Sequence, residues 1–122
     1  MTSSQAVTSL ALVVGAAIGG FIRFYAEYRF PPIGQKAFPR ATFAVNVAGS
    51  FILGLLINAP HLFHVALGIG FCGALTTFSG VSLQLSRRFR SGDWKQASIY
   101  LVTILVATLA AAWAGIQLGQ ML

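Results

Sequence analysis

Four apolar stretches, each about as long as a bilayer is thick, account for most of this chain. An α-helix needs roughly 20 apolar residues to cross a membrane, and the stretches cover 7–25, 41–59, 64–85 and 97–118. Only 8% of the residues are charged, far below the share in soluble domains. A length of 122 residues suits one domain. The sequence therefore predicts an all-α integral membrane protein, with one four-helix domain over residues 1–122.

The third stretch has a composition that an uninterrupted membrane helix avoids. Between residues 70 and 80 it contains three glycines and the adjacent Thr76 and Thr77. Glycine lets the backbone leave helical geometry, and hydroxyls give the freed backbone groups local partners. Within hydrocarbon such a break persists only where it is buried in protein or lines a polar cavity. We predict a third helix that is broken near mid-membrane, which is typical of a binding site; a glycine-rich packing face is the alternative.

The basic residues gather at one end of the predicted bundle. All eight Lys and Arg flank the first or the third connection. With four spans these connections share one side, so the positive-inside rule places 26–40 and 86–96 in the cytoplasm and both termini outside. We expect a multi-pass protein of the cell inner membrane and no nucleic-acid partner. Because no basic residue precedes the first stretch, we expect that stretch to be retained as a helix.

Neutral hydrogen-bonding groups dominate the polar content of the spans. The only carboxylates, Glu27 and Asp93, are expected in or beside loops. No enzyme constellation is visible, and a proton-driven pump is disfavoured. The remaining candidates within the spans are hydroxyls, one amide and one aromatic edge: Thr42, Asn46, Ser50, Thr76, Thr77, Phe78 and Ser79. Such donors suit a weakly held anion, and carbonyls exposed by a break suit a hard cation. A small-anion path and an apolar scaffold both stay open.

Several of these residues have a plainer interpretation as well. Arg23 lies near the end of the first stretch, where a snorkelling arginine commonly marks the interface. Asn46 could make an interhelical hydrogen bond. The lone Cys72 is expected to be a small packing residue, and His61 and His64 to be solvated side chains of the second loop rather than metal ligands.

Three separated blocks combine glycines with polar residues at fixed spacings. They are Gly15-x-x-x-Gly19-Gly20-x-x-Arg23, Thr42-x-x-Val45-Asn46-x-x-Gly49-Ser50-Phe51-x-x-Gly54 and Gly70-Phe71-Cys72-Gly73-x-x-Thr76-Thr77-Phe78-Ser79. Together with Tyr100 in the fourth stretch, these blocks resemble the signature of the Fluc (CrcB) fluoride channels. The resemblance covers all four spans.

The resemblance implies a passive fluoride channel that exports fluoride and relieves its toxicity. It implies an antiparallel dimer with two narrow fluoride pathways and a structural Na⁺ at its centre, held by the backbone carbonyls of Gly73 and Thr76. The residues that it places along a pathway are Asn46, Phe78, the vestibule residue Arg23, and Tyr100 with nearby hydroxyls.

Two features depart from the family pattern. Members usually carry a second phenylalanine three residues after the first, where this chain has Val81. Homodimeric members need balanced flanking charge to insert both ways, whereas here all basic residues lie on one side. We therefore hypothesise that the chain pairs with a non-identical, oppositely oriented subunit, a homodimer being the other arrangement. The rival functions are a non-conducting structural partner subunit and a small cation-coupled exporter.

Overall fold

The described part of the chain is helical throughout, apart from short turns. The computed structural model describes residues 1–31 and 38–122, and these contain no strand. The helices are α1 (Ser3–Arg29), α2 (Arg40–Leu55), α3 (His61–Phe63), the π-helical η1 (His64–Cys72), α4 (Gly73–Leu75), α5 (Phe78–Arg90) and α6 (Trp94–Met121). Three helical units, 3–29, 61–90 and 94–121, are long and apolar enough to cross a membrane, and α2 is a shorter apolar helix. The all-α membrane fold predicted from the sequence is confirmed.

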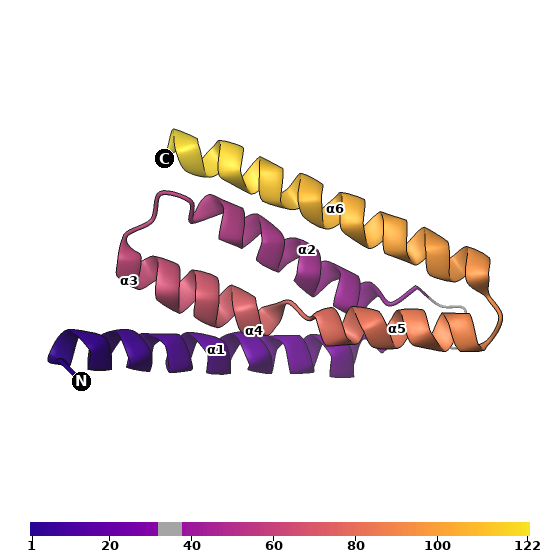
Figure 1. Cartoon of the computed structure of the whole chain (residues 1–122), viewed down its shortest axis with the longest axis horizontal. Coiled ribbons are helices and arrows are strands. Elements are labelled where there is room, and N and C mark those ends of the chain that lie inside the picture. The colour runs from indigo at the N-terminus through magenta and orange to yellow at the C-terminus, as the bar shows by residue number, and fades with distance from the viewer. Residues whose placement is uncertain (32–37) are drawn as a thin grey trace.

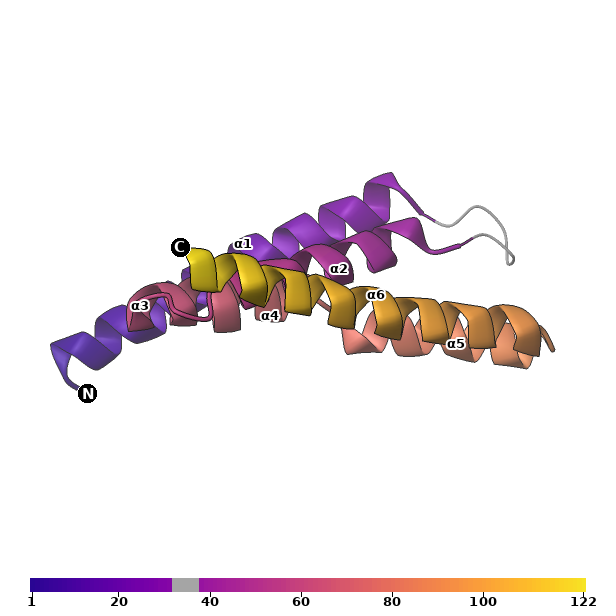
Figure 2. The same cartoon turned by 90° about the horizontal axis from the view of Figure 1, so that it is seen from above.

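The helices run as four rods of similar direction (Figure 1). Both termini lie at one end, with the connection from α2 to α3, and the turn from α5 to α6 lies at the other end, as Figure 2 also shows. Arg90 ends α5 beside that turn, and Arg29 and Arg40 stand at the ends of α1 and α2 that point in the same direction. Lys36 and the rest of 32–37 lie outside the described residues.

Several boundaries differ from the expected loops. α1 runs to Arg29, so Glu27 lies inside a helix and not in a loop. The connection expected over 86–96 shrinks to residues 91–93, because α5 continues to Arg90 and the Asp93 carboxylate accepts from the Gln96 amide to start α6. The segment expected to be a loop around His61 and His64 is helical, since His61 opens α3 and His64 opens η1.

Glycines let two helix pairs approach until their backbones touch. A Cβ atom at Gly15 would overlap the Ala66 carbonyl, and one at Gly19 would overlap the Phe71 carbonyl. These contacts fix α1 against η1, and the four-residue spacing of Gly15 and Gly19 is the small-xxx-small pattern that lets helices approach closely. On the other side of the bundle, Gly54, Gly115 and Gly119 bring α2 equally close to α6. In both pairs the backbones pack directly against each other, while α1 and α6 leave most of their large apolar side chains exposed.

The third helical unit is broken at its middle. α4 ends at Leu75 and α5 begins at Phe78. Between them the backbone is extended, with φ −77° and ψ 150° at Thr76 and φ −144° and ψ 119° at Thr77. The predicted break is confirmed. The alternative, a glycine-rich packing face, also holds at Gly70, where a Cβ atom would lie 2.7 Å from the Leu12 carbonyl oxygen of α1. The π-helical geometry of η1 just before the break had no recognisable signal in the sequence.

Candidate functional site

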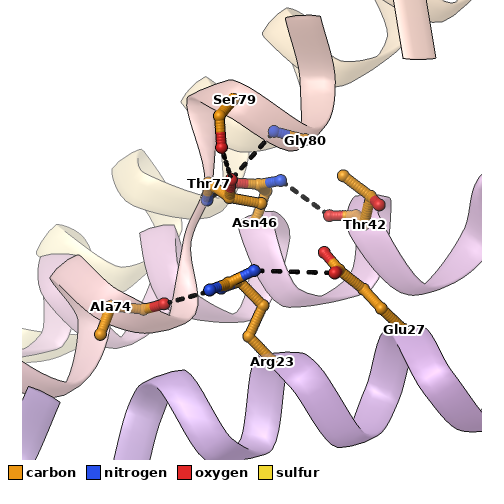
Figure 3. Close-up of polar contacts among 8 residues, drawn as sticks. All are labelled: Arg23, Glu27, Thr42, Asn46, Ala74, Thr77, Ser79 and Gly80. Atoms are coloured by element: carbon orange, nitrogen blue, oxygen red, sulfur yellow. Dashed lines mark hydrogen bonds and ion pairs between the residues drawn. The ribbon is translucent and has the colours of Figure 1, made fainter. Parts of the chain in front are cut away.

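Side chains from two neighbouring helices satisfy the backbone groups that the break releases. In a continuous helix the Thr77 amide and the Ala74 carbonyl would each bond a backbone group four residues away. Instead, the Thr77 amide donates to Oδ1 of Asn46 (2.9 Å), and the Ala74 carbonyl accepts from Nε of Arg23 (3.1 Å). Figure 3 shows Arg23 against Ala74 on one flank of the break and Asn46 beside Thr77 on the other. The extended segment is thereby fixed by α2 and by α1.

Asn46 is the most constrained polar side chain at the break. It is buried, and its Nδ2 donates to the Thr42 carbonyl one turn earlier (2.7 Å) while its Oδ1 accepts from the Thr77 amide. An amide nitrogen carries two hydrogens, and the bond to Thr42 uses one of them. The interhelical hydrogen bond expected as the plain interpretation is therefore present. The same geometry presents a neutral amide beside the break.

Thr77 starts the second half of the broken helix. Its Oγ1 accepts from the Gly80 amide at 3.0 Å and lies 3.0 Å from the Ser79 hydroxyl oxygen. This is an N-cap, and it satisfies one of the amides that a helix start leaves without a partner. Two hydroxyls, one amide and the first turn of α5 thus meet within a few ångströms of one another (Figure 3).

A cavity of about 100 Å³ adjoins this cluster on the side of the basic helix ends. Its lining comes from the ends of α1, α2 and α5: Glu27, Phe30, Pro39, Ala41, Thr42, Gly80, Leu83 and Gln84. Thr42 and Gly80 belong to both the cavity wall and the hydrogen-bonded cluster at the break. A cavity of this size holds water, since about 15 Å³ suffices for one molecule.

The structure gathers some of the predicted site residues and separates others. Arg23, Thr42, Asn46, Thr77 and Ser79 meet at the break. Phe78 stands at the break as the first residue of α5 but is 85% exposed. Ser50 is half-buried further along α2, and Tyr100 is a buried residue of α6.

The two residues assigned to a cation site lie on the α4 side of the break. The Thr76 hydroxyl donates to the Cys72 carbonyl (2.9 Å), and Gly73 is exposed. In a continuous helix the Gly73 carbonyl would accept from the Thr77 amide, which instead bonds to Asn46. Cys72 itself is buried as a packing residue, as expected.

Val81 and Tyr100 belong to a closed core between α5 and α6. Together with Ile104 they form a buried cluster, against which Phe43 and Leu85 pack. The guanidinium carbon of Arg88 lies 5.4 Å from the centre of the Tyr100 ring, and Arg88 itself is buried. Although Phe78 and Val81 are three residues apart, one is exposed and the other is buried in this chain.

Sequence reasoning missed two participants at the break. Glu27 pairs with Arg23, with Nη1 and Oε2 3.6 Å apart, and the i, i+4 spacing of the two residues could have indicated this contact. The Ala74 carbonyl carried no signal at all, because its availability depends on where the helix stops.

Comparison with known proteins gives one consistent result. The family model described as "CrcB-like protein, Camphor Resistance (CrcB)" matches residues 10–116. A fluoride-specific ion channel FluC 2 from Rhodococcus jostii is 40% identical over 92% of this chain and 98% of its own length. A fluoride-specific ion channel FluC from Saccharophagus degradans is 37% identical over 100% of this chain and 99% of its own. The extent of these matches shows that this chain belongs to the CrcB family.

Proposed function

We propose that this chain is a subunit of a fluoride-selective channel through which fluoride leaves the cell passively, relieving fluoride toxicity. The observation that carries the proposal is the cluster at the break, where Asn46, Thr77 and Ser79 offer an amide and two hydroxyls with no carboxylate among them. Neutral donors replace part of the hydration shell of an anion and still release it. The names of the related proteins support fluoride as that anion.

The proposed pathway passes the break and reaches both neighbouring helices. It contains Arg23 at the mouth, the donors at the break and Phe78, whose exposed ring faces outward from this subunit. Ser50, further along α2, and Tyr100, a buried residue of α6, are the proposed outer members. Passage of an ion through such donors needs no catalytic group, so we propose no enzymatic activity.

A structural Na⁺ is proposed at the other flank of the break. The donor set fits, because the Gly73 carbonyl loses its helical partner to Asn46 and the extended backbone at Thr76 turns its carbonyl out of the helix. Backbone carbonyls freed in this way suit a small hard cation. Replacing Na⁺ by an organic cation is expected to abolish fluoride flux or to dissociate the assembly, and unchanged flux and assembly would remove Na⁺ from the proposal.

Assembly is proposed as an antiparallel dimer in the cell inner membrane, with both termini outside. Gly73 belongs to the proposed Na⁺ site and Phe78 to the proposed pathway, and both are exposed in the single subunit. This exposure supports a partner subunit that covers them. All eight basic residues flank one pair of connections, which favours a single orientation for this chain. We therefore propose an oppositely oriented, non-identical partner. A stable dimer of this chain alone with full fluoride flux would contradict that pairing.

A non-conducting structural role is the second candidate, and one observation favours it. Val81 stands where the family pattern usually has an aromatic residue, and it is closed into the core with Tyr100 and Ile104. A pathway that needs an aromatic edge at this position would be incomplete in this subunit.

Fluoride efflux from liposomes separates the two candidates. The purified chain is reconstituted alone and with candidate partner subunits, and a fluoride electrode follows the release of trapped potassium fluoride. A channel subunit raises fluoride release above that of empty liposomes without raising chloride release. If the partner subunit alone releases fluoride as fast as the pair does, this chain adds no pathway and has the structural role.

A further inference from the structure

The pairing of Glu27 with Arg23 contributes little to the stability of α1. Glu27 lies two residues before the end of the helix, where the helix dipole disfavours a negative charge. The order of the pair, with the cation on the N-terminal side, is also the less favourable one for an i, i+4 contact. Both side chains are about two-thirds buried. A costly charge in such a place points to a role outside the helix itself.

Glu27 lines the cavity beside the break, and one of its carboxylate oxygens is buried without a partner in the part of the chain that the structure describes. Oε1 of Glu27 is buried and has no hydrogen-bond partner among the described residues. Thr42 and Gln84 line the same cavity as Glu27. The other oxygen, Oε2, faces Arg23. Figure 3 shows this pair running alongside the pair formed by Thr42 and Asn46.

Arg23 connects this carboxylate to the break. Its Nε donates to the Ala74 carbonyl in the last turn before the chain leaves the helix, and its Nη1 faces Glu27. One guanidinium thus fixes a backbone group at the break and offsets a carboxylate that would otherwise repel anions. Removal of either charge leaves the other without compensation at a partly buried position, where charges are poorly screened.

We propose that Glu27 is a positioning residue of the anion pathway. It holds the Arg23 guanidinium against the Ala74 carbonyl and offsets its charge, so that the mouth attracts fluoride without retaining it. This inference rests on the proposed channel function, and it assigns charge balance at the pathway mouth to a residue of α1 outside the three sequence blocks.

Charge-removing variants in the conducting assembly test the inference. Glu27→Gln leaves Arg23 uncompensated, so the fluoride concentration for half-maximal flux should fall several-fold, and flux should depend more steeply on ionic strength. Arg23→Gln leaves the carboxylate uncompensated, so flux should fall about tenfold. The double variant should conduct better than Arg23→Gln alone, which loss of packing would not produce.

Asp93→Asn is the matched control. It removes the other carboxylate of the chain, at the N-cap of α6, and asparagine caps a helix equally well. Its concentration and salt dependence should equal those of the wild type.

The outcomes separate this inference from the proposed function. Absence of fluoride flux in the wild-type assembly refutes the channel itself. A conducting wild type refutes the positioning role if Glu27→Gln keeps the wild-type concentration and salt dependence, or if the double variant shows no recovery. Should Arg23→Gln fail to assemble, the two readouts of Glu27→Gln decide alone.

Discussion

Asn46→Asp is the most direct test of an anion path at the break. The substitution keeps the size of the side chain and its acceptor for the Thr77 amide. It replaces the Nδ2 donor by a second oxygen, which then faces the Thr42 carbonyl across the present 2.7 Å contact. One hydrogen bond is lost and one is strengthened by charge, so we expect a loss of unfolding free energy of about 1–3 kcal/mol.

The effect on conduction should be much larger than the effect on stability. Asn46 is 8% exposed, so a carboxylate there is poorly solvated. A fluoride ion passing about 4 Å from that charge would be repelled by roughly 4 kcal/mol at an effective dielectric constant of about 20. Since 1.36 kcal/mol corresponds to a factor of ten in rate, flux should fall by about three orders of magnitude.

The assay is fluoride release from liposomes that contain the conducting assembly, measured by electrode at equal protein content. Asn58→Asp is the matched control, because it makes the same chemical change at an exposed position beyond the end of α2. Its flux should equal that of the wild type. Size-exclusion profiles check that both variants are assembled.

The reasoning fails if Asn46→Asp is assembled and releases fluoride at the wild-type rate. In that case Asn46 acts only as the interhelical contact seen at the break. An equal loss of flux in Asn58→Asp would also refute the local argument, since it would show that any added negative charge near α2 suffices.

Three further substitutions test the packing that positions the site, each by the thermal stability of the purified protein. Gly19→Ala should lower the free energy of unfolding by about 1–3 kcal/mol, because its Cβ would overlap the Phe71 carbonyl. Gly20→Ala, whose nearest contact would be at 3.9 Å, should leave that free energy unchanged. Equal stabilities of the two variants would contradict the close approach of α1. Thr77→Ala should lower the free energy of unfolding by about 1 kcal/mol, because α5 loses its N-cap. Thr77→Ser keeps the capping hydroxyl and should keep the wild-type stability. Val81→Phe should lower the free energy of unfolding by about 1–3 kcal/mol, because the larger side chain overfills a closed core. A more stable variant with increased flux would contradict this and show that the core has room.

The sequence alone was sufficient to predict features that depend only on residues close together in the chain. Span length and apolar content determine the membrane fold, and the density of glycine and threonine around Thr76 predicts a break, because backbone freedom and local hydroxyl partners are properties of the segment itself. The cap at Asp93 is a local feature of the same kind, because its carboxylate accepts from an amide only three residues further on. Gly15 and Gly19 indicated a close approach, although not the helix that would approach.

Contacts between distant segments were decided only by the tertiary structure. Asn46 and Thr77 are 31 residues apart, and Arg23 and Ala74 are 51 apart, so no local pattern shows that these pairs satisfy the break. The position of Glu27 between Arg23 and a cavity likewise depends on where α1, α2 and α5 end together. A broken helix can be encoded locally, but the partners of its freed amides and carbonyls exist only once other helices pack against it.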